Sequence, residues 1–214
     1  MSDARPTVFL LDDDAAVLVA LERMLNARGF QVRACMSAVQ FLGEHDPDAP
    51  GCLVADVRMP GMDGLELQRA LRARGCERPI VFITGQGDIA TTVQAMKAGA
   101  VTFLSKPVPG AELVAAVNEA FARDVQQRAE RCEWLEVSKR LASLTPREHQ
   151  VLDLVATGLL NKQIAARLGA AEKTIKVHRR RIMQKMQART ATALVGLLSR
   201  AEARTVSRPN GHSG

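Results

Sequence analysis

The sequence predicts a doubly wound α/β domain with a five-stranded parallel sheet, joined by a helical linker to an all-helical domain that contains a helix-turn-helix. Two observations lead to this prediction. Short apolar runs alternate five times with helical periodicity up to about residue 122, which is typical of βαβ units with right-handed crossovers. After residue 140, three or four short helices are expected and no convincing strand follows.

The expected elements of the first domain alternate strictly between strand and helix. Val, Ile, Leu and Phe dominate the strands, and Gly29, Gly75 and Gly99 follow three of the helices, as glycine often does at helix C-termini. The expected strands are 8–11, 32–34, 53–55, 80–83 and 101–104, and the expected helices are 15–28, 38–44, 65–74, 89–97 and one that starts at about residue 111.

The boundary between the domains lies in a helical segment without a clear stop. The last helix of the first domain continues into a strongly charged stretch, which is typical of a solvated linker. The second domain has a clear start, because Thr145, Pro146 and Glu148 form the signature of a helix N-terminus. The expected division is a first domain at 1–122, a linker at 123–140, a helix-turn-helix domain at 141–203 and a disordered tail at 204–214, rich in Ser, Pro and Gly.

The net charge of +6 conceals a sharp asymmetry between the two halves. Residues 1–122 carry 11 Lys and Arg against 15 Asp and Glu, whereas residues 123–214 carry 18 against 8. An acidic first half suits a metal and phosphate site. A basic second half suits a polyanionic partner, most simply nucleic acid.

Cysteine usage and the N-terminus bear on the compartment. The four cysteines are scattered without a Cys-x-x-Cys pair, which argues against a disulfide framework or a zinc site and favours a reducing compartment. The chain has no apolar leader and no apolar run long enough to span a membrane. We therefore expect a cytoplasmic protein with no membrane partner.

Acidic, hydroxyl and amino side chains follow four of the expected strands. Because the carboxyl ends of parallel strands meet at one edge of a sheet, these side chains are expected to converge on one crevice. Such a pocket could accept a phosphoryl group, since this transfer needs alignment and charge neutralisation more than covalent help. The converging residues are Asp12, Asp13, Asp56, Thr84 and Lys106.

The expected cofactor of this pocket is Mg²⁺, which takes oxygen ligands. Asp56 would also attack phosphorus, while Lys106 and Thr84 would bind phosphoryl oxygens. Taken singly, these residues have simpler explanations, because an aspartate after a strand usually caps a helix and a lysine before proline usually faces solvent. Their joint occurrence at four strand ends favours the pocket. The expected magnesium ligands are Asp12, Asp13, Asp56 and the backbone carbonyl of Arg58.

Four motifs surround these residues: Leu11-Asp12-Asp13-Asp14, the run VADVRMPGMDG at 54–64, Ile83-Thr84-Gly85-Gln86-Gly87-Asp88, and Phe103-Leu104-Ser105-Lys106-Pro107. Together they resemble the receiver domain of two-component response regulators, specifically its FixJ branch, over about residues 6–122. The resemblance implies a sensor histidine kinase as partner. It also implies Asp56 as the phosphoacceptor, Asp12 and Asp13 as metal-binding acids, Lys106 as the phosphoryl partner, Thr84 as the switch hydroxyl and Phe103 as the switch aromatic.

Two positions depart from the pattern of that branch. Phe103 stands where a tyrosine is often found, which excludes a hydroxyl-mediated contact there. Gln86 stands where histidine is common, which leaves the dephosphorylation rate open.

A basic helix is expected at about 171–186, separated from a helix at 161–168 by a tight turn at Gly169. A charged helix is usually just a solvated face, but the preceding helix and turn favour a DNA-reading element, since an α-helix fits the major groove. The near absence of aromatic residues in this half argues against single-stranded binding by base stacking. Duplex DNA is therefore the expected partner.

The segments Leu144-Thr145-Pro146-Arg147-Glu148, GLLNKQIA at 158–165 and KTIKVHR at 173–179 resemble the LuxR-type helix-turn-helix over about residues 140–200. The resemblance implies that Lys176, Val177 and Arg180 face base edges. It further implies that Thr145, Lys162, Lys173 and Thr174 approach phosphates, with Lys185 as an additional candidate, and that the last helix, near 191–199, contributes to a dimer contact.

Both resemblances together imply a two-component response regulator. A sensor histidine kinase would phosphorylate Asp56, and phosphorylation would promote homodimerisation and sequence-specific binding to promoter DNA, with RNA polymerase as a further candidate partner. One alternative is an atypical regulator whose DNA binding ignores phosphorylation. An enzyme alternative, a magnesium-dependent phosphatase with an Asp12-x-Asp14 nucleophile motif, fits less well, because Ala16 stands where that family has Thr or Val and the basic half stays unexplained. The chain is therefore not expected to be an enzyme.

Overall fold

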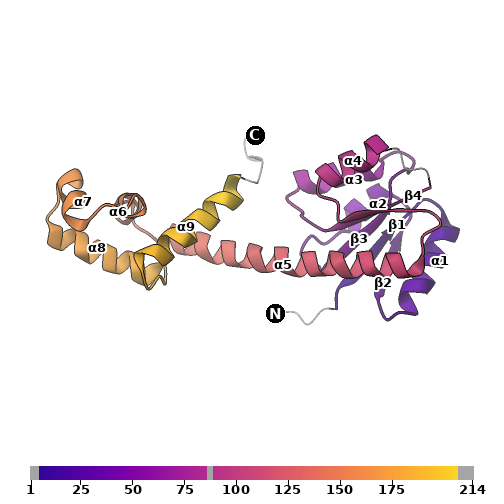
Figure 1. Cartoon of the computed structure of the whole chain (residues 1–214), viewed down its shortest axis with the longest axis horizontal. Helices are drawn as coiled ribbons and strands as arrows, with labels where there is room; N and C mark the ends of the chain where they lie inside the picture. Colours follow the sequence, from indigo (N-terminus) through magenta and orange to yellow (C-terminus); the bar gives the residue numbers. More distant parts are fainter. Residues whose placement is uncertain (1–4, 86–88, 207–214) are drawn as a thin grey trace. The chain divides into compact units, whose positions relative to one another are not determined.

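The computed structural model describes residues 5–85 and 89–206. The chain divides into two compact units, residues 1–128 and 129–214, and the division falls inside the long helix α5 (Gly110–Ala142). Figure 1 shows α5 as one unbroken helix. Gln86, whose role the sequence left open, lies outside the described residues, as do residues 207–214 of the expected tail.

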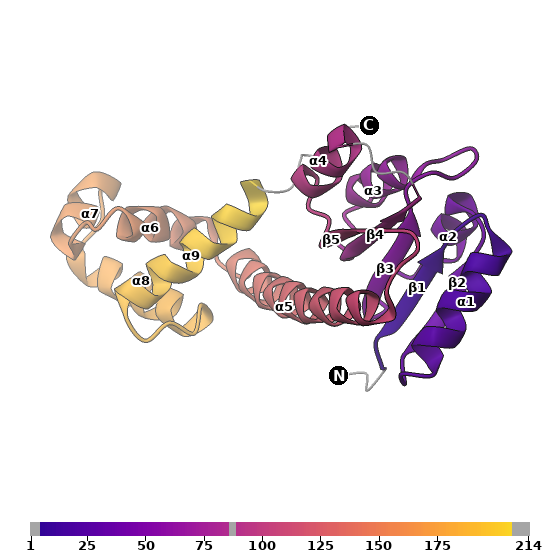
Figure 2. The ribbon, with the colours of Figure 1, turned by 45° about the vertical axis from the view of Figure 1, so that its right-hand side comes forward.

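The first unit is built on a five-stranded sheet in the order β2-β1-β3-β4-β5, with every neighbouring pair parallel. This confirms the predicted doubly wound α/β class, and Figure 2 shows the strands side by side. The central strands β3 and β4 are buried along their whole length, as continuous apolar runs in a parallel sheet require. The strands are β1 (Thr7–Leu11), β2 (Gln31–Cys35), β3 (Gly51–Asp56), β4 (Ile80–Thr84) and β5 (Thr102–Ser105).

Helices cover both faces of this sheet and create two apolar cores. One core joins the sheet to α2, α3 and α4, and the other joins it to α1 and α5. Polar side chains fix where helices start: Asp14 caps α1, Ser37 caps α2, and Asp63 forms a reciprocal capping box with Glu66 in α3. The helices are α1 (Ala15–Asn26), α2 (Ala38–Glu44), α3 (Gly64–Ala73) and α4 (Ile89–Lys97), in addition to α5.

The first residue of β3 is bound to α5, at the end of the strand opposite to Asp56. Its last residue is Asp56. At its first residue, the Gly51 amide donates a 3.0 Å hydrogen bond to Oδ2 of Asp124, a buried carboxylate on α5. Arg128, one turn further along α5, reaches Asp124 with its Nε at 3.6 Å and donates to the carbonyl of Asp48. The start of β3 is therefore anchored to α5.

The second unit is helical throughout its described part, as predicted. Its core joins the C-terminal end of α5, through Val137, to the four following helices. The predicted N-terminal signal is confirmed, since Thr145 and Glu148 form a capping box and Pro146 is the first residue of α6. Gly169, with φ of 60°, separates α7 from α8. These helices are α6 (Pro146–Ala156), α7 (Asn161–Leu168), α8 (Glu172–Lys185) and α9 (Ala191–Val206).

One helix boundary differs from expectation. The helix α9 continues to Val206, so residues 204–206, assigned from the sequence to a disordered tail, are helical. Ala, Glu and Arg from residue 201 onward favour helix. The next proline, which disfavours helix at the residue before it, is Pro209. Within residues 5–85 and 89–206, no helix is both long and apolar enough to cross a membrane.

The first residue of β3 has no room for a side chain. Gly51 has φ of 143°, and a Cβ at this position would lie 2.0 Å from the carbonyl oxygen of Thr7 in β1. Gly51→Ala is therefore expected to lower the free energy of unfolding by at least about 2 kcal/mol, measured by urea denaturation. As a control, Gly43→Ala in α2 meets no atom within 4 Å and should raise stability by about 0.5–1 kcal/mol. Equal stability of the two variants would contradict this account.

Candidate metal centre and nucleic-acid interface

Three carboxylates and one ammonium meet at the carboxyl edge of the sheet. Asp12 follows β1, Asp56 ends β3, and Lys106 follows β5, so the parallel register brings them together. The Nζ atom of Lys106 lies 2.6 Å from Oδ2 of Asp12 and 2.7 Å from Oδ2 of Asp56. Both carboxylates are buried, at 2% and 8% exposure. The sequence-predicted convergence of these three side chains is present.

The same edge can hold a cation. Among the described residues, Asp12, Asp13 and Asp56 are the one group of three or more carboxylate, His or Cys side chains whose ligand atoms lie within 4.8 Å of one another. Two of the three are buried and Asp13 is exposed, which leaves one side open to solvent and to ligands. Three carboxylates with no nitrogen or sulfur donor suit a hard divalent cation. The Arg58 amide donates a 3.1 Å hydrogen bond to Oδ1 of Asp56, so the turn after β3 folds back toward this group.

Lys106 is held in its charged form. Its partial burial opposes the ammonium, but hydrogen bonds to Asp12 and Asp56, and the charges of both, outweigh burial and raise the pKa of Lys106. Its backbone amide donates a 2.7 Å hydrogen bond to the carbonyl of Thr84. The Lys106–Pro107 peptide bond is cis.

The two expected switch residues lie on neighbouring strands. Thr84, at the end of β4, is buried at 1% exposure. Phe103 in β5 is half-buried, and its ring packs against that of Phe82 with centroids 6.3 Å apart. Thr84 is therefore close in the sheet to Lys106 and Phe103, as the strand order requires.

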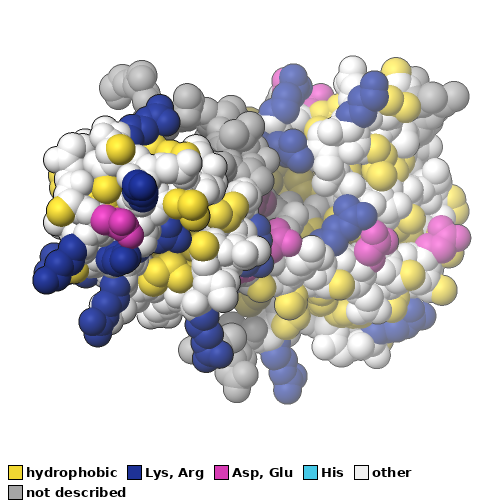
Figure 3. All heavy atoms as spheres, turned by 60° about the vertical axis from the view of Figure 1, so that its left-hand side comes forward, with side chains coloured by type: hydrophobic (Ala, Val, Ile, Leu, Met, Phe, Trp, Pro, Cys, Tyr) yellow, Lys and Arg dark blue, Asp and Glu magenta, His cyan; other side chains and the backbone are white. Residues whose placement is uncertain are grey.

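The helix α8 keeps one face for the core and exposes the other. Ile175 and Ile182 are buried, as expected, together with Met186 just after the helix. Val177, whose packing the sequence left uncertain, is 45% exposed. Figure 3 shows Lys and Arg side chains spread over the surface of the helical domain. The exposed residues that the sequence assigned to DNA are Thr145, Lys162, Lys173, Thr174, Lys176, Val177 and Arg180.

Three cations of α8 have partners within the domain. Arg179 donates a 3.0 Å hydrogen bond to Oδ1 of Asn161 at the start of α7. Lys176 lies 3.1 Å from the Glu172 carboxylate, one turn earlier in α8. The third cation, Lys185, is the one residue of the expected DNA-binding set that points into the domain.

Lys185 fastens the end of α8 to the start of α6. Its Nζ lies 2.7 Å from Oε2 of the buried Glu148 and donates a 2.9 Å hydrogen bond to the carbonyl of Ser143. The hydrogen bond from Lys185 and the one from the Thr145 amide lower the pKa of Glu148 to about 2. Through the interaction with Glu148, Lys185 helps to fix the position of α8 within the domain.

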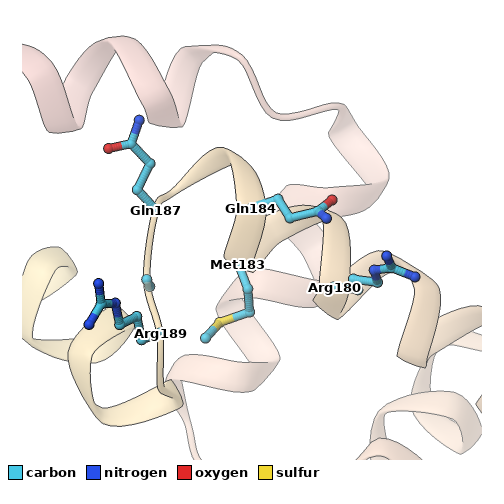
Figure 4. A pocket seen from close by; sticks show the side chains of 6 residues that line it. Arg180, Met183, Gln184, Gln187 and Arg189 are labelled. Atoms are coloured by element: carbon cyan, nitrogen blue, oxygen red, sulfur yellow. The ribbon is translucent and has the colours of Figure 1, made fainter.

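A shallow hollow lies beside α8, and one of its residues was missed by the sequence reasoning. It is lined by Arg180, Met183 and Gln184 from α8 and by Gln187, Ala188 and Arg189 from the turn that follows (Figure 4). Arg189 is exposed, and its position just after the basic helix is the signal that could have marked it as a further cation of this surface.

Comparison with known families decides what the two units are. Residues 8–118 match the family described as the response regulator receiver domain, and residues 142–198 match the bacterial regulatory proteins of the LuxR family. The chain belongs to the response regulators. It joins a receiver domain to a LuxR-type DNA-binding domain, and it is therefore a transcription regulator and not an enzyme.

Relatives and solved structures agree with this assignment over most of the chain. The response regulator protein TodT of Pseudomonas putida is 44% identical over 200 residues, which cover 94% of this chain and 88% of TodT. The transcriptional regulatory protein FixJ of Azorhizobium caulinodans is 43% identical, covering 88% of this chain and 89% of FixJ. The structure of the response regulator StyR matches with a TM-score of 0.77 at 47% identity, covering 92% of this chain and 99% of StyR.

The buried carboxylate of Glu148 is expected to make the DNA-binding domain sensitive to acid. Its pKa is about 2 in the folded chain and 4.5 in the unfolded chain, so its stabilisation is complete above pH 4.5 and is lost as the pH falls toward 2. Glu148→Gln should lower the free energy of unfolding by about 2–3 kcal/mol at pH 7, and the difference from the natural chain should shrink below pH 4. Fluorescence of Trp134, the single tryptophan, reports this unit.

The matched control is Glu136→Gln. Glu136 pairs with Lys139 at 3.0 Å on the exposed surface of α5, and its loss should change stability by less than about 0.5 kcal/mol. A Glu148→Gln deficit that is the same at pH 7 and pH 3 would show that the carboxylate charge contributes nothing.

Proposed function

We propose that the chain is a phosphorylation-gated regulator of transcription, in which a sensor histidine kinase donates a phosphoryl group to Asp56. The observation that carries this proposal is the Asp12–Lys106–Asp56 arrangement, with Asp13 beside it, at one edge of the sheet. The receiver domain itself implies a histidine kinase partner, and the LuxR-type domain implies DNA.

The transfer needs one nucleophile and several charge partners. An oxygen of the Asp56 carboxylate attacks phosphorus, the bond from phosphorus to the kinase histidine nitrogen breaks, and an acyl phosphate forms. Mg²⁺ would be held by Asp12, Asp13, Asp56 and the Arg58 carbonyl, and it supplies neutralisation of the phosphoryl charge. Lys106 already contacts Asp56 and is charged, so its ammonium has only to exchange a carboxylate oxygen for a phosphoryl oxygen.

The response to phosphorylation uses the neighbouring strands. The Thr84 hydroxyl moves toward the new phosphoryl oxygens, and Phe103 turns inward from its half-buried position. These two changes repack the surface formed by α4 and α5, which then forms a homodimer. Phosphorylation in this scheme biases an element with two arrangements.

In the dimer, two α8 helices bind half-sites about one helical turn apart. Lys176, Val177 and Arg180 face base edges, while Lys162, Lys173, Thr174 and Thr145 approach phosphates and set the register. Lys185 contributes to phosphate binding less directly, because its ammonium is bound to Glu148 and Ser143. RNA polymerase is a further partner of the promoter-bound dimer, and the cytoplasm is the compartment in which all these partners meet.

Asp56→Asn should abolish phosphoryl uptake from acetyl phosphate and from a phosphorylated kinase, because a neutral amide replaces the attacking carboxylate. Uptake of ³²P, measured by gel electrophoresis, tests this. The matched control is Asp14→Asn, since Asp14 caps α1 and asparagine caps a helix equally well, so uptake should stay near that of the natural chain. Retained uptake in Asp56→Asn would overturn the assignment of the phosphoacceptor.

The gate itself is tested by selection from a random pool of duplex DNA, with and without acetyl phosphate and Mg²⁺. An inverted repeat should be enriched with the phosphoryl donor, because only the dimer contacts both half-sites. Analytical ultracentrifugation under the same conditions should show the shift from monomer to dimer. Equal enrichment with and without the donor would retain DNA binding and remove phosphorylation as the gate.

A further inference from the structure

The helix α8 carries one acidic residue, Glu172, among six lysines and arginines. The Glu172 carboxylate lies in the first turn of α8, its side chain is 46% exposed, and it lies 3.1 Å from Nζ of Lys176, whose side chain is 62% exposed. An anion on a helix that enters DNA is repelled by phosphates. Its presence at this position therefore calls for a physical explanation.

A purely structural role explains part of this observation. A carboxylate in the first turn is favourable for the helix dipole, and a Glu–Lys pair four residues apart supports a helix. Both effects are small for exposed groups, and they do not depend on where the pair points. The pair, however, includes a residue that we assign to base recognition, and it lies at the N-terminal end of α8, the part of a recognition helix that contacts base edges.

The other bound cations of α8 differ in this respect. Lys185 is bound to the buried Glu148, and Arg179 is bound to the half-buried Asn161. Both partners lie on other helices, so these contacts join α8 to the rest of the domain. Glu172 and Lys176 are both exposed and contact each other on the surface of one helix. Their ammonium and carboxylate thus form an adjacent donor and acceptor that are open to a ligand.

The edge of a base pair in the major groove has the complementary arrangement. In a G·C pair, O6 of guanine accepts and N4 of cytosine donates, and the two atoms are joined by a Watson–Crick hydrogen bond of about 2.9 Å. In a T·A pair, O4 of thymine and N6 of adenine form the same pattern. The 3.1 Å separation in the Glu172–Lys176 pair matches this spacing. The pair can therefore meet both bases without separating.

We propose that Glu172 is a specificity-determining residue that, with Lys176, reads the orientation of one base pair. Lys176 donates to the keto oxygen of guanine or thymine on one strand, and Glu172 accepts from the amino group of cytosine or adenine on the other. Guanine is preferred over thymine because its N7 accepts from the ammonium as well. In the reversed base pair, the Lys176 ammonium faces an amino group and the Glu172 carboxylate faces a keto oxygen, so a donor meets a donor and an acceptor meets an acceptor. This inference rests on the proposed DNA-binding function.

The experiment uses the full chain and the inverted repeat obtained by selection, with every half-site position changed in turn to the other three base pairs. Competition binding is measured at two salt concentrations for the natural chain, Glu172→Gln, Lys176→Ala and the double variant. At one position the natural chain should prefer G·C, then T·A, and should bind C·G and A·T about tenfold or more weakly. In Glu172→Gln this orientation preference should fall to less than about threefold, because an amide both donates and accepts.

Two further results are expected. Lys176→Ala should lose discrimination at the same position, and the double variant should lose no more than the single ones, because the pair acts as a unit. The matched control is Asp153→Asn, an exposed carboxylate on α6, which should leave every base preference unchanged. Thermal unfolding temperatures of all variants should lie within about 5 °C of that of the natural chain, because the exposed pair contributes little to stability. This separates recognition from folding.

Distinct results would overturn the inference and the function on which it rests. Glu172→Gln with unchanged base preference at every position would overturn the inference, as would loss of preference at a position different from that affected by Lys176→Ala. Failure of the natural chain to select any sequence would instead overturn the proposed function, and the inference with it.

Discussion

The arrangement of the receiver domain depends on one electrostatic interaction, the bridge from Lys106 to Asp12 and Asp56. Two buried carboxylates at the ends of adjacent strands repel each other, and an ammonium between them offsets that repulsion. The bridge joins the carboxyl ends of β1, β3 and β5. Three acids against one lysine leave a negative charge imbalance there, which suits a divalent cation.

Much of this site could be predicted because parallel sheets put strand ends at one edge. The alternation of apolar runs and helices is enough to predict a parallel sheet, and a charged residue just after a strand is then expected at its carboxyl edge. The ion pair between Lys185 and Glu148 could not be predicted in this way, because it joins α8 to α6 across 37 residues of sequence. Basic residues on one helix look alike in a sequence, and only packing shows which of them are already bound.

The helix ends illustrate the same division between local and distant causes. The start of α6 was predictable because its cap, proline and glutamate lie within four consecutive residues. The end of α9 was predicted too early. A run of good helix formers continues beyond the last core residues, whereas the prediction followed the Ser, Pro and Gly content of the last residues. The anchor from Asp124 to the Gly51 amide had no sequence signal at all, since it joins α5 to a strand 73 residues earlier.

That anchor has a mechanical consequence for β3, the strand that ends in Asp56. The strand β3 is only six residues long, lies between β1 and β4, and is tied at its first residue to a buried carboxylate. Both edges of β3 are paired with a neighbouring strand, and its first residue is bound to α5. A strand held in this way resists sliding along its own axis, so a change at the Asp56 end is expected to displace the surrounding loops and helices more than β3 itself.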